Sequence, residues 1–239
     1  MKNAFWTIFK TEAKLSIRGG DMVFFGVIFP AAVMLLVGCI SGAEAMRAGF
    51  AGIAAIGICA AGLMGIPLTF ASYRHEKILK RLKVTPVSPL LLFLSVTLVQ
   101  TLFAWASALA VYLIARIFFK LEMTGSLLRF GISFLFVQFS VYSLGFMIAS
   151  LVPNTKTANL VCAIVYFPTL FLSGATVPYE IMPRALRYFA DVFPLTQGIK
   201  LLKGAVFGLD PAADFSRIIV LSLIAVVSYI LSLLFFRWE

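Results

Sequence analysis

The stretch AGFAGIAAIGICAAGLMGIPLTFASY, residues 48–73, contains no charged side chain. A helix needs about 20 residues, predominantly apolar, to cross the roughly 30 Å interior of a bilayer, so this stretch predicts a membrane-spanning helix. Gly57, Ala61 and Gly65 recur at every fourth position, and small residues at this spacing let another helix backbone approach closely. The sequence does not say whether that second helix belongs to the same chain.

Similar uncharged stretches flank this one on both sides. They cover residues 22–43, 84–115, 130–155, 157–179 and 218–236, and the third of the six stretches, 84–115, is too long for one span, so part of it must be interfacial. With 62% hydrophobic and only 13% charged residues, the chain is more apolar than a soluble domain. The sequence therefore predicts an all-α integral membrane protein with six transmembrane helices, kinked at Pro30 and Pro67.

Lysine and arginine concentrate in two segments, with four in the first 21 residues and five in residues 74–83. The positive-inside rule places both segments in the cytoplasm, and six spans return the C-terminus to the same side. The basic loop around Arg116, Lys120 and Arg129 falls outside in this arrangement, against the rule. The formal net charge of +10 is thus interpreted as orientation and contact with anionic membrane lipids, and no nucleic-acid partner is expected.

Residues 1–21 have the pattern of an amphipathic helix that lies in the membrane interface. One side is a polar stripe, made of Thr7, Lys10, Thr11, Lys14 and Arg18. The other side is mostly apolar, with Phe5, Trp6, Phe9, Ala13 and Ile17. Residues 22–239 are then expected to form the six-span domain.

The cytoplasmic loop YRHEKILKRLKVTPVSP, residues 73–89, combines charge with a small apolar ridge. Residues 73–84 predict about three helical turns that end before Pro86, because a residue before proline disfavours the helical region. Glu76 and Lys80 would form a favourable pair one turn apart. One interpretation is a solvated loop that only sets topology. The other is a short helix along the membrane that presents its ridge of Ile78, Leu79 and Leu82 to a cytoplasmic partner.

Catalytic and metal-binding chemistry has little support in this sequence. His75 is the single histidine, and Glu44, Glu122, Glu180 and Asp191 are isolated acids without catalytic spacing, which argues against a lipid-modifying membrane enzyme. The three cysteines lie in apolar stretches as packing residues, and no metal site is expected. No charge lies at the centre of a span, which argues against an ATP-independent, ion-coupled secondary carrier. Gln100 and Gln138, the main polar mid-span residues, are expected to form hydrogen bonds between helices.

Three segments together resemble the membrane subunit of type-2 exporters of the ABC transporter class. They are FWTIFKTEAKLSIRGGD before the first span, YRHEKILKRLKVTPVSPLLLF after the second, and FLSGATVPYEIMPRALRYFADVFPLTQGIKLLKGAVFG between the fifth and sixth. The resemblance implies that the second segment is the coupling region that docks a separate ATPase. The docking residues it implies are Arg74, Glu76, Lys77, Ile78, Leu79, Lys80, Arg81 and Leu82.

The same resemblance implies that residues 173–212 fold as short re-entrant helices that form a lid on the outer side. Gly174 and Pro178 would end the fifth span, Pro183 would open a short helix, and Pro194 would interrupt the chain before residues 195–206.

Partners and location also follow from the resemblance. It implies a dimer, most simply of two copies of this chain, with two copies of a cytoplasmic ABC ATPase in a bacterial plasma membrane. ATP and Mg²⁺ would be bound by the ATPase, and no cofactor by this chain, which has no Walker A pattern. The cargo would be an amphiphile moved outward, such as a drug, peptide, lipid or glycan precursor, and its binding residues are unknown.

Overall fold

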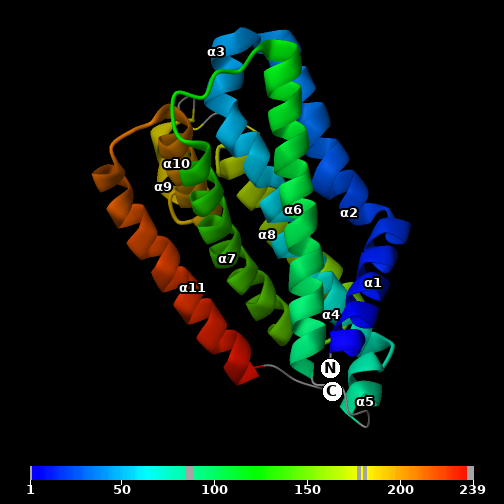
Figure 1. Cartoon of the computed structure of the whole chain (residues 1–239). Helices are drawn as coiled ribbons and strands as arrows, with labels where there is room; N and C mark the ends of the chain where they lie inside the picture. The colour runs from blue at the N-terminus through cyan, green and yellow to red at the C-terminus, as the bar shows by residue number, and fades with distance from the viewer. Residues whose placement is uncertain (1, 84–88, 177–178, 180–181, 236–239) are drawn as a thin grey trace.

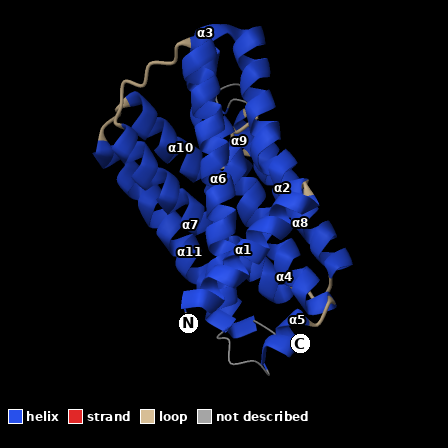
Figure 2. Cartoon of the chain, turned by 45° about the vertical axis from the view of Figure 1, so that its right-hand side comes forward, coloured by secondary structure: helices blue, strands red, loops and turns tan. Residues whose placement is uncertain are grey.

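The computed structural model describes residues 2–83, 89–176, 179 and 182–235, and within this part the chain is helical without strands (Figures 1 and 2). The elements are α1 (Lys2–Gly19), α2 (Asp21–Val23), η1 (Phe24–Ile28), α3 (Phe29–Cys59), η2 (Ala60–Gly65), α4 (Ile66–His75), α5 (Ile78–Lys83), α6 (Pro89–Phe119), α7 (Leu127–Leu151), α8 (Thr155–Leu172), α9 (Arg184–Ala190), α10 (Pro194–Phe207), η4 (Pro211–Asp214) and α11 (Phe215–Phe235).

Six segments of the described chain are long and apolar enough to cross a membrane, which confirms the predicted number. They are Asp21–Ile40, Met46–His75, Leu90–Phe119, Leu127–Leu151, Thr155–Leu172 and Phe215–Phe235. The third runs past Arg116, beyond the predicted stretch, because a long basic side chain near a helix end can reach toward the interface. The fifth ends earlier than predicted, since the backbone turns at Gly174 with φ of 88°.

The spans differ sharply in how much protein surrounds them. In the Met46–His75 span, 83% of the most apolar stretch of 18 residues is buried, and in the Leu127–Leu151 span the share is 67%. In the other four spans only 22% to 28% of the corresponding stretch is buried. The second and fourth spans, Met46–His75 and Leu127–Leu151, therefore form the centre of the bundle, and the other four spans form an apolar rim. The high burial of the Met46–His75 span follows from the size of its side chains. It is rich in glycine and alanine, so other helices can approach it from several sides.

Both prolines that predicted kinks follow a stretch of π-helix. η1 precedes Pro30, and η2 precedes Pro67, so each proline stands at the start of the next α-helical segment. A proline lacks the amide proton that an α-helix requires, and a π-helical turn is one way to absorb the missing bond. The second span thus changes helical register midway, between α3 and α4.

The predicted small-residue face of the second span meets helices of the same chain. A Cβ added at Gly57 would lie 2.6 Å from Ser107 of α6, and one at Gly65 would lie 2.6 Å from the Gln100 side chain on the same helix. On α7 the approach is to backbone, because a Cβ at Gly145 would lie 2.0 Å from the Gly62 carbonyl oxygen. Glycine at these positions is what lets α6 and α7 pack directly on the central span.

The molecule has two dissimilar ends. Figure 1 shows α1, α5 and the last turn of α11 at one end, which we call the terminal end, and α9 and α10 near the opposite end, which we call the distal end. The chain reverses within α3 at the distal end, between the first two spans. Of the three segments that the sequence singled out, the first two lie at the terminal end and the third lies near the distal end.

Candidate functional site

At the terminal end the second span ends in a sharp turn. α4 ends at His75, the Lys77 amide donates to the Arg74 carbonyl at 3.0 Å, and Lys77 itself has φ of 57°. A positive φ is uncommon for a residue with a side chain and marks a real break in the helix. The continuous helix predicted over 73–84 is therefore wrong. Glu76 does not sit one helical turn from Lys80, and its carboxylate accepts a hydrogen bond from Ser72 at 3.2 Å instead.

The turn separates the predicted docking residues into exposed and buried ones. Glu76, Lys77, Lys80 and Arg81 are exposed, whereas Ile78 is half-buried and Leu79 is only 1% exposed. Leu79 thus faces the interior of this chain and holds α5 against it. The Leu82 side chain lies outside the described residues.

Arg74 connects the turn to a second loop. Its guanidinium Nη1 donates to the Val152 carbonyl at 2.6 Å, directly after α7. Val152 follows the other central span, so this one bond joins the terminal ends of the two most buried helices.

The buried face of α1 contains a carboxylate that the sequence pattern did not reveal. Glu12 is 7% exposed, and it faces the Tyr73 hydroxyl of α4, although the two groups do not meet the geometry of a formed hydrogen bond. Burial raises the pKa of Glu12 above its ordinary value of 4.5, and the nearby Tyr73 hydroxyl only partly offsets this. Trp6 and Ile17, which the pattern assigned to the apolar face, are exposed.

Docking of α1 should therefore weaken as pH rises. A raised pKa in the folded state means that the stabilisation is complete below pH 4.5 and is lost as pH rises through the raised pKa. Glu12→Gln keeps the size of the side chain and removes the titration. We expect hydrogen exchange of the α1 amides, corrected for intrinsic rates, to be pH-dependent in the natural chain and flat in the variant. Glu122→Gln, at an exposed acid, should behave like the natural chain, and a pH dependence that survives Glu12→Gln would contradict this assignment.

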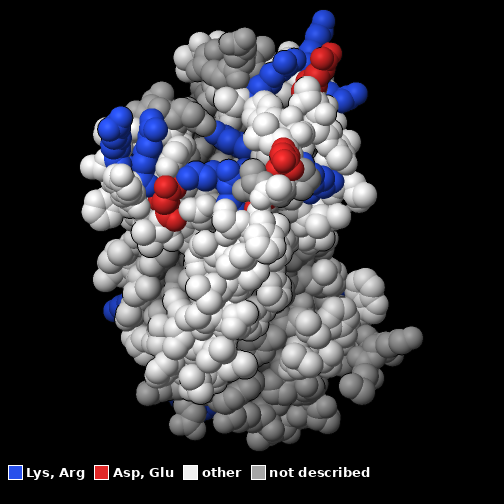
Figure 3. Space-filling view, turned by 90° about the vertical axis from the view of Figure 1, so that its left-hand side faces the viewer, with Lys and Arg blue, Asp and Glu red and all other residues white. Residues whose placement is uncertain are grey.

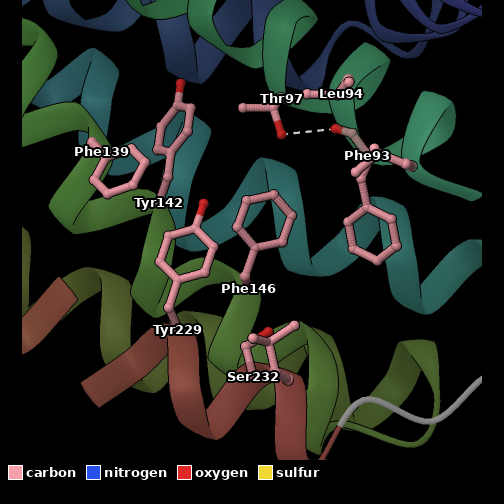
Figure 4. Close-up of a pocket in the computed structure, with 10 residues that line it drawn as sticks. Phe93, Leu94, Thr97, Phe139, Tyr142, Phe146, Tyr229 and Ser232 are labelled. Atoms are coloured by element: carbon pink, nitrogen blue, oxygen red, sulfur yellow. Dashed lines mark hydrogen bonds between the residues drawn. The ribbon is translucent and has the colours of Figure 1, made fainter. Parts of the chain in front are cut away.

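A large apolar pocket opens between α6, α7 and α11, in the half of the molecule near the termini (Figure 4). Its volume is about 610 Å³, within the range of small-molecule sites. Figure 4 shows the rings of Tyr142, Phe146 and Tyr229 around one space, with Phe93 on the α6 side. The described residues that line it include hydroxyls but no charged side chain.

At the distal end, the predicted lid residues take the following places. Gly174 turns the chain after α8, Pro183 is the N-cap of α9, and Pro194 is the first residue of α10, while Pro178 lies outside the described residues. Gly174 also rests on the bundle, because a Cβ added at Gly52 of α3 would lie 2.6 Å from its carbonyl oxygen. α10 is the most buried part of this segment and packs on α7, α3 and α11.

Two clusters of charged side chains hold the distal end together. Asp191 accepts from the Tyr179 hydroxyl at 2.9 Å and from the Lys200 ammonium, which also lies 4.1 Å from the Tyr179 ring centre. Asp214, with its side chain 5% exposed, accepts from Arg129 at 2.8 Å and Arg217 at 2.6 Å. Figure 3 shows that most of the charged side chains on the face it draws gather in its upper part, above a mostly uncharged surface.

The chain from α1 through α10 matches a known family. Residues 3–207 match the family model of the ABC-2 type transporter. The chain belongs to the ABC-2 type transporter family. No curated protein and no solved structure matches it.

As an ABC-2 permease, this protein is a multi-pass transmembrane subunit of an ABC transporter. Such subunits have no ATPase domain, and the nucleotide is bound by the ABC ATPase subunits with which they work. The resemblance drawn from the three sequence segments is thus confirmed at the level of the family.

The polar mid-span residues of this ABC-2 permease differ from expectation. Gln138 donates to the Tyr142 hydroxyl at 2.9 Å within α7, so the expected bond between helices is wrong for this residue. Gln100 packs against Gly65, and its Oε1 has no hydrogen-bond partner among the described residues. The sequence could not predict the contacts of either glutamine, because both depend on which helix faces these positions.

Proposed function

We propose that this chain is the permease of an ATP-driven exporter, in which the turn between α4 and α5 docks the ATPase. One observation carries the proposal: the most buried span of the bundle, Met46–His75, leads directly into the exposed, charged turn. A force applied at the turn therefore acts on the centre of the fold and not on a peripheral loop. This fits a rigid-body transition driven by closure of the ATPase pair.

Exposed charges make the docking contact in this proposal. Glu76, Lys77, Lys80 and Arg81 offer polar groups to a partner, and the buried Leu79 anchors α5 so that these groups keep their positions. Arg74, half-buried and bonded to Val152, passes the movement to α7. Of the ridge predicted from the sequence, Ile78 and Leu79 thus serve mainly to fix the short helix.

The terminal end would lie in the cytoplasm, and α1 in the membrane interface beside it. The basic residues of α1 and of the α4–α5 turn support this orientation. Exposed Trp6 and Ile17 on α1 support contact with the lipid boundary. Location in a bacterial plasma membrane and outward transport rest on the family resemblance.

The segment 173–212 would act as a re-entrant lid at the outer end. Backbone that does not span is tolerated at membrane depth only where it is packed in protein or faces water. The burial of α10 against α7, α3 and α11 meets that condition. The pathway itself would be completed by a second copy of the chain, since the apolar rim spans, with only 22% to 28% of their most apolar stretches buried, leave surface for such contact.

An amphiphile is the cargo class that the pocket between α6, α7 and α11 favours. Its aromatic walls suit an apolar body, and the Thr97, Tyr229 and Ser232 side chains bring hydroxyl groups to the same space. The absence of charge among its described lining residues disfavours a hydrophilic ion.

The docking assignment is tested by reversing one charge. Glu76→Arg should leave membrane insertion and size-exclusion behaviour unchanged but abolish co-purification of the ATPase, because the partner surface would then meet a like charge. Glu122→Arg makes the same change at an exposed acid outside the turn and should retain the ATPase. Normal association and ATP-dependent transport in Glu76→Arg would refute the docking site. Transport that stops when the proton gradient is collapsed, with ATP maintained, would point to a secondary carrier.

A further inference from the structure

The large pocket between α6, α7 and α11 opens sideways, toward the outer surface of the bundle. α11 packs on α7 and α6 packs on α3, whereas α6 and α11 have little direct contact with each other. The most exposed side chains that line the pocket are all apolar, at 50% to 78% exposure: Leu90 and Leu94 of α6, Phe139 of α7 and Leu233 of α11. All four lie in membrane-spanning segments. The opening between α6 and α11 therefore faces the hydrocarbon chains of the bilayer.

The pocket lies close to the terminal end of these spans. On α6, its deepest lining residue, Thr97, is eight residues from the start of the helix at Pro89. On α11, Ser232 is three residues from the last described residue of the helix, Phe235. At 1.5 Å per residue, the pocket extends from the end of the spans to about 12 Å inside them. This is the depth at which a membrane lipid has its ester groups and the first part of its chains.

The size of the pocket matches a single chain of a lipid. Its volume is about 610 Å³, and at about 30 Å³ for each non-hydrogen atom, the volume of a water molecule, this holds roughly 20 such atoms. One long acyl chain with its ester group has about that number. The second chain of a two-chain lipid would remain in the bilayer, which the sideways opening permits.

Two hydroxyl groups in the pocket are available to a ligand. Tyr229 and Ser232 are three residues apart on α11, which places them on the same face of the helix. Both line the pocket, and neither hydroxyl has a hydrogen-bond partner among the described residues. The Thr97 hydroxyl, by contrast, donates to the Phe93 carbonyl at 2.8 Å. Figure 4 shows the Tyr229 hydroxyl directed into the pocket. Because hydrocarbon offers no water to such groups, they favour a ligand that brings an acceptor.

We infer that this pocket binds one acyl chain of a membrane lipid, with the ester carbonyl of that chain held by the hydroxyls of Tyr229 and Ser232. The chain would enter sideways from the leaflet at the terminal end and lie against the aromatic walls. A carbonyl oxygen has two lone pairs, so it can accept from both hydroxyls. The described lining has no charged side chain, so the headgroup would stay in the interface. That this lipid is the exported amphiphile rests on the proposed function, whereas its binding does not.

The test uses the full chain in detergent, freed of bound lipid and without the ATPase. Two probes carry the same chain with a photoreactive diazirine: lysophosphatidylcholine with an ester-linked chain, and its ether-linked analogue, which lacks the carbonyl. Labelled peptides are identified by mass spectrometry. The ester probe should label α6, α7 and α11 around the pocket at a roughly threefold to tenfold lower concentration than the ether probe. Labelling spread evenly over the rim spans would overturn the site, and equal concentrations for both probes would overturn the carbonyl contact.

A double variant links the preference for the ester to the two hydroxyls. Tyr229→Phe and Ser232→Ala remove both hydroxyls and keep the shape of the wall almost unchanged. In this variant the ester probe should bind no better than the ether probe, while the ether probe binds as it does to the natural chain. Ser216→Ala, at an exposed serine near the other end of α11, should keep the preference. If the double variant still prefers the ester, the hydroxyls do not hold the carbonyl.

A second copy of this chain is the competing occupant of the opening. In that case Leu233→Cys would form a disulfide-linked dimer in membranes, and the ester probe would leave the pocket unlabelled, which would overturn the lipid assignment. This variant is made together with Cys39→Ser, because Cys39 is an exposed cysteine.

The binding test and the docking test can fail separately. Because probe binding is measured without the ATPase, failure of the docking test leaves the lipid site standing. Conversely, an unlabelled pocket in a chain that still couples to its ATPase would remove the site and leave the exporter.

Discussion

Gly145→Ala should prevent normal folding of the bundle. A Cβ at this position would lie 2.0 Å from the Gly62 carbonyl oxygen and 3.0 Å from its carbon, and both atoms belong to the backbone of the central span. A flexible side chain could move away, but a backbone carbonyl inside a packed helix cannot without shifting η2. Overpacking typically costs about 1–3 kcal/mol and occasionally more, and a clash with backbone atoms belongs at the upper end of that range. We expect a strong loss of the monodisperse species in detergent and a large drop in the unfolding midpoint.

Gly131→Ala is the matched control on the same helix. A Cβ there would come no closer than 3.6 Å to the Trp105 side chain, an ordinary contact. The added methyl group should be neutral or slightly stabilising, because alanine favours a helix over glycine by up to about 1 kcal/mol. Equal behaviour of the two variants would mean that α7 does not approach the central span as closely as described.

Asp214→Ala should destabilise the chain by about 3 kcal/mol. Its buried carboxylate is shared by Arg129 of α7 and Arg217 of α11, so one substitution leaves two guanidinium groups without their counter-ion. Removing one partner of a buried pair is costly because the remaining charge is left unpaired, and the arginines, with side chains 27% exposed, recover part of this from water. Unfolding in a mild denaturant series should show the loss, accompanied by faster hydrogen exchange at the start of α11.

Asp210→Ala is the control for Asp214→Ala, because it removes a nearby acid that does not belong to the ion cluster. Asp210 is exposed and accepts from the Ala212 amide, as the N-cap of η4. Loss of that cap should cost only about 1 kcal/mol. If both variants lose the same stability, the ion cluster does not hold the distal end in the way we describe.

The spans were predictable because a single physical quantity, the thickness of the hydrocarbon core, sets both their length and their lack of charge. The sequence also indicated the turns after α8 and before α9 and α10, since Gly174, Pro183 and Pro194 act through their own backbone.

Contacts between distant residues were not predictable in the same way. Asp214 lies 85 residues from Arg129, and nothing in the local pattern pairs them. The break in the helix at Lys77 was not predicted, because a lysine in the sequence does not indicate a positive φ. Glu12 was missed because helical periodicity describes average polarity around a helix and cannot detect one acid turned toward a tyrosine on another helix.

The unequal burial of the spans also sets how freely this sequence can diverge. The exposed side of a rim helix such as α11 needs little more than apolar side chains of any shape, so substitutions on that side should accumulate almost neutrally. The central span is different, because Gly57, Gly62 and Gly65 leave no room for a methyl group. Two members of the family can therefore share few identical residues while keeping the same bundle. Homologues of this chain should be easier to detect from the spacing of small residues in the second span than from overall identity.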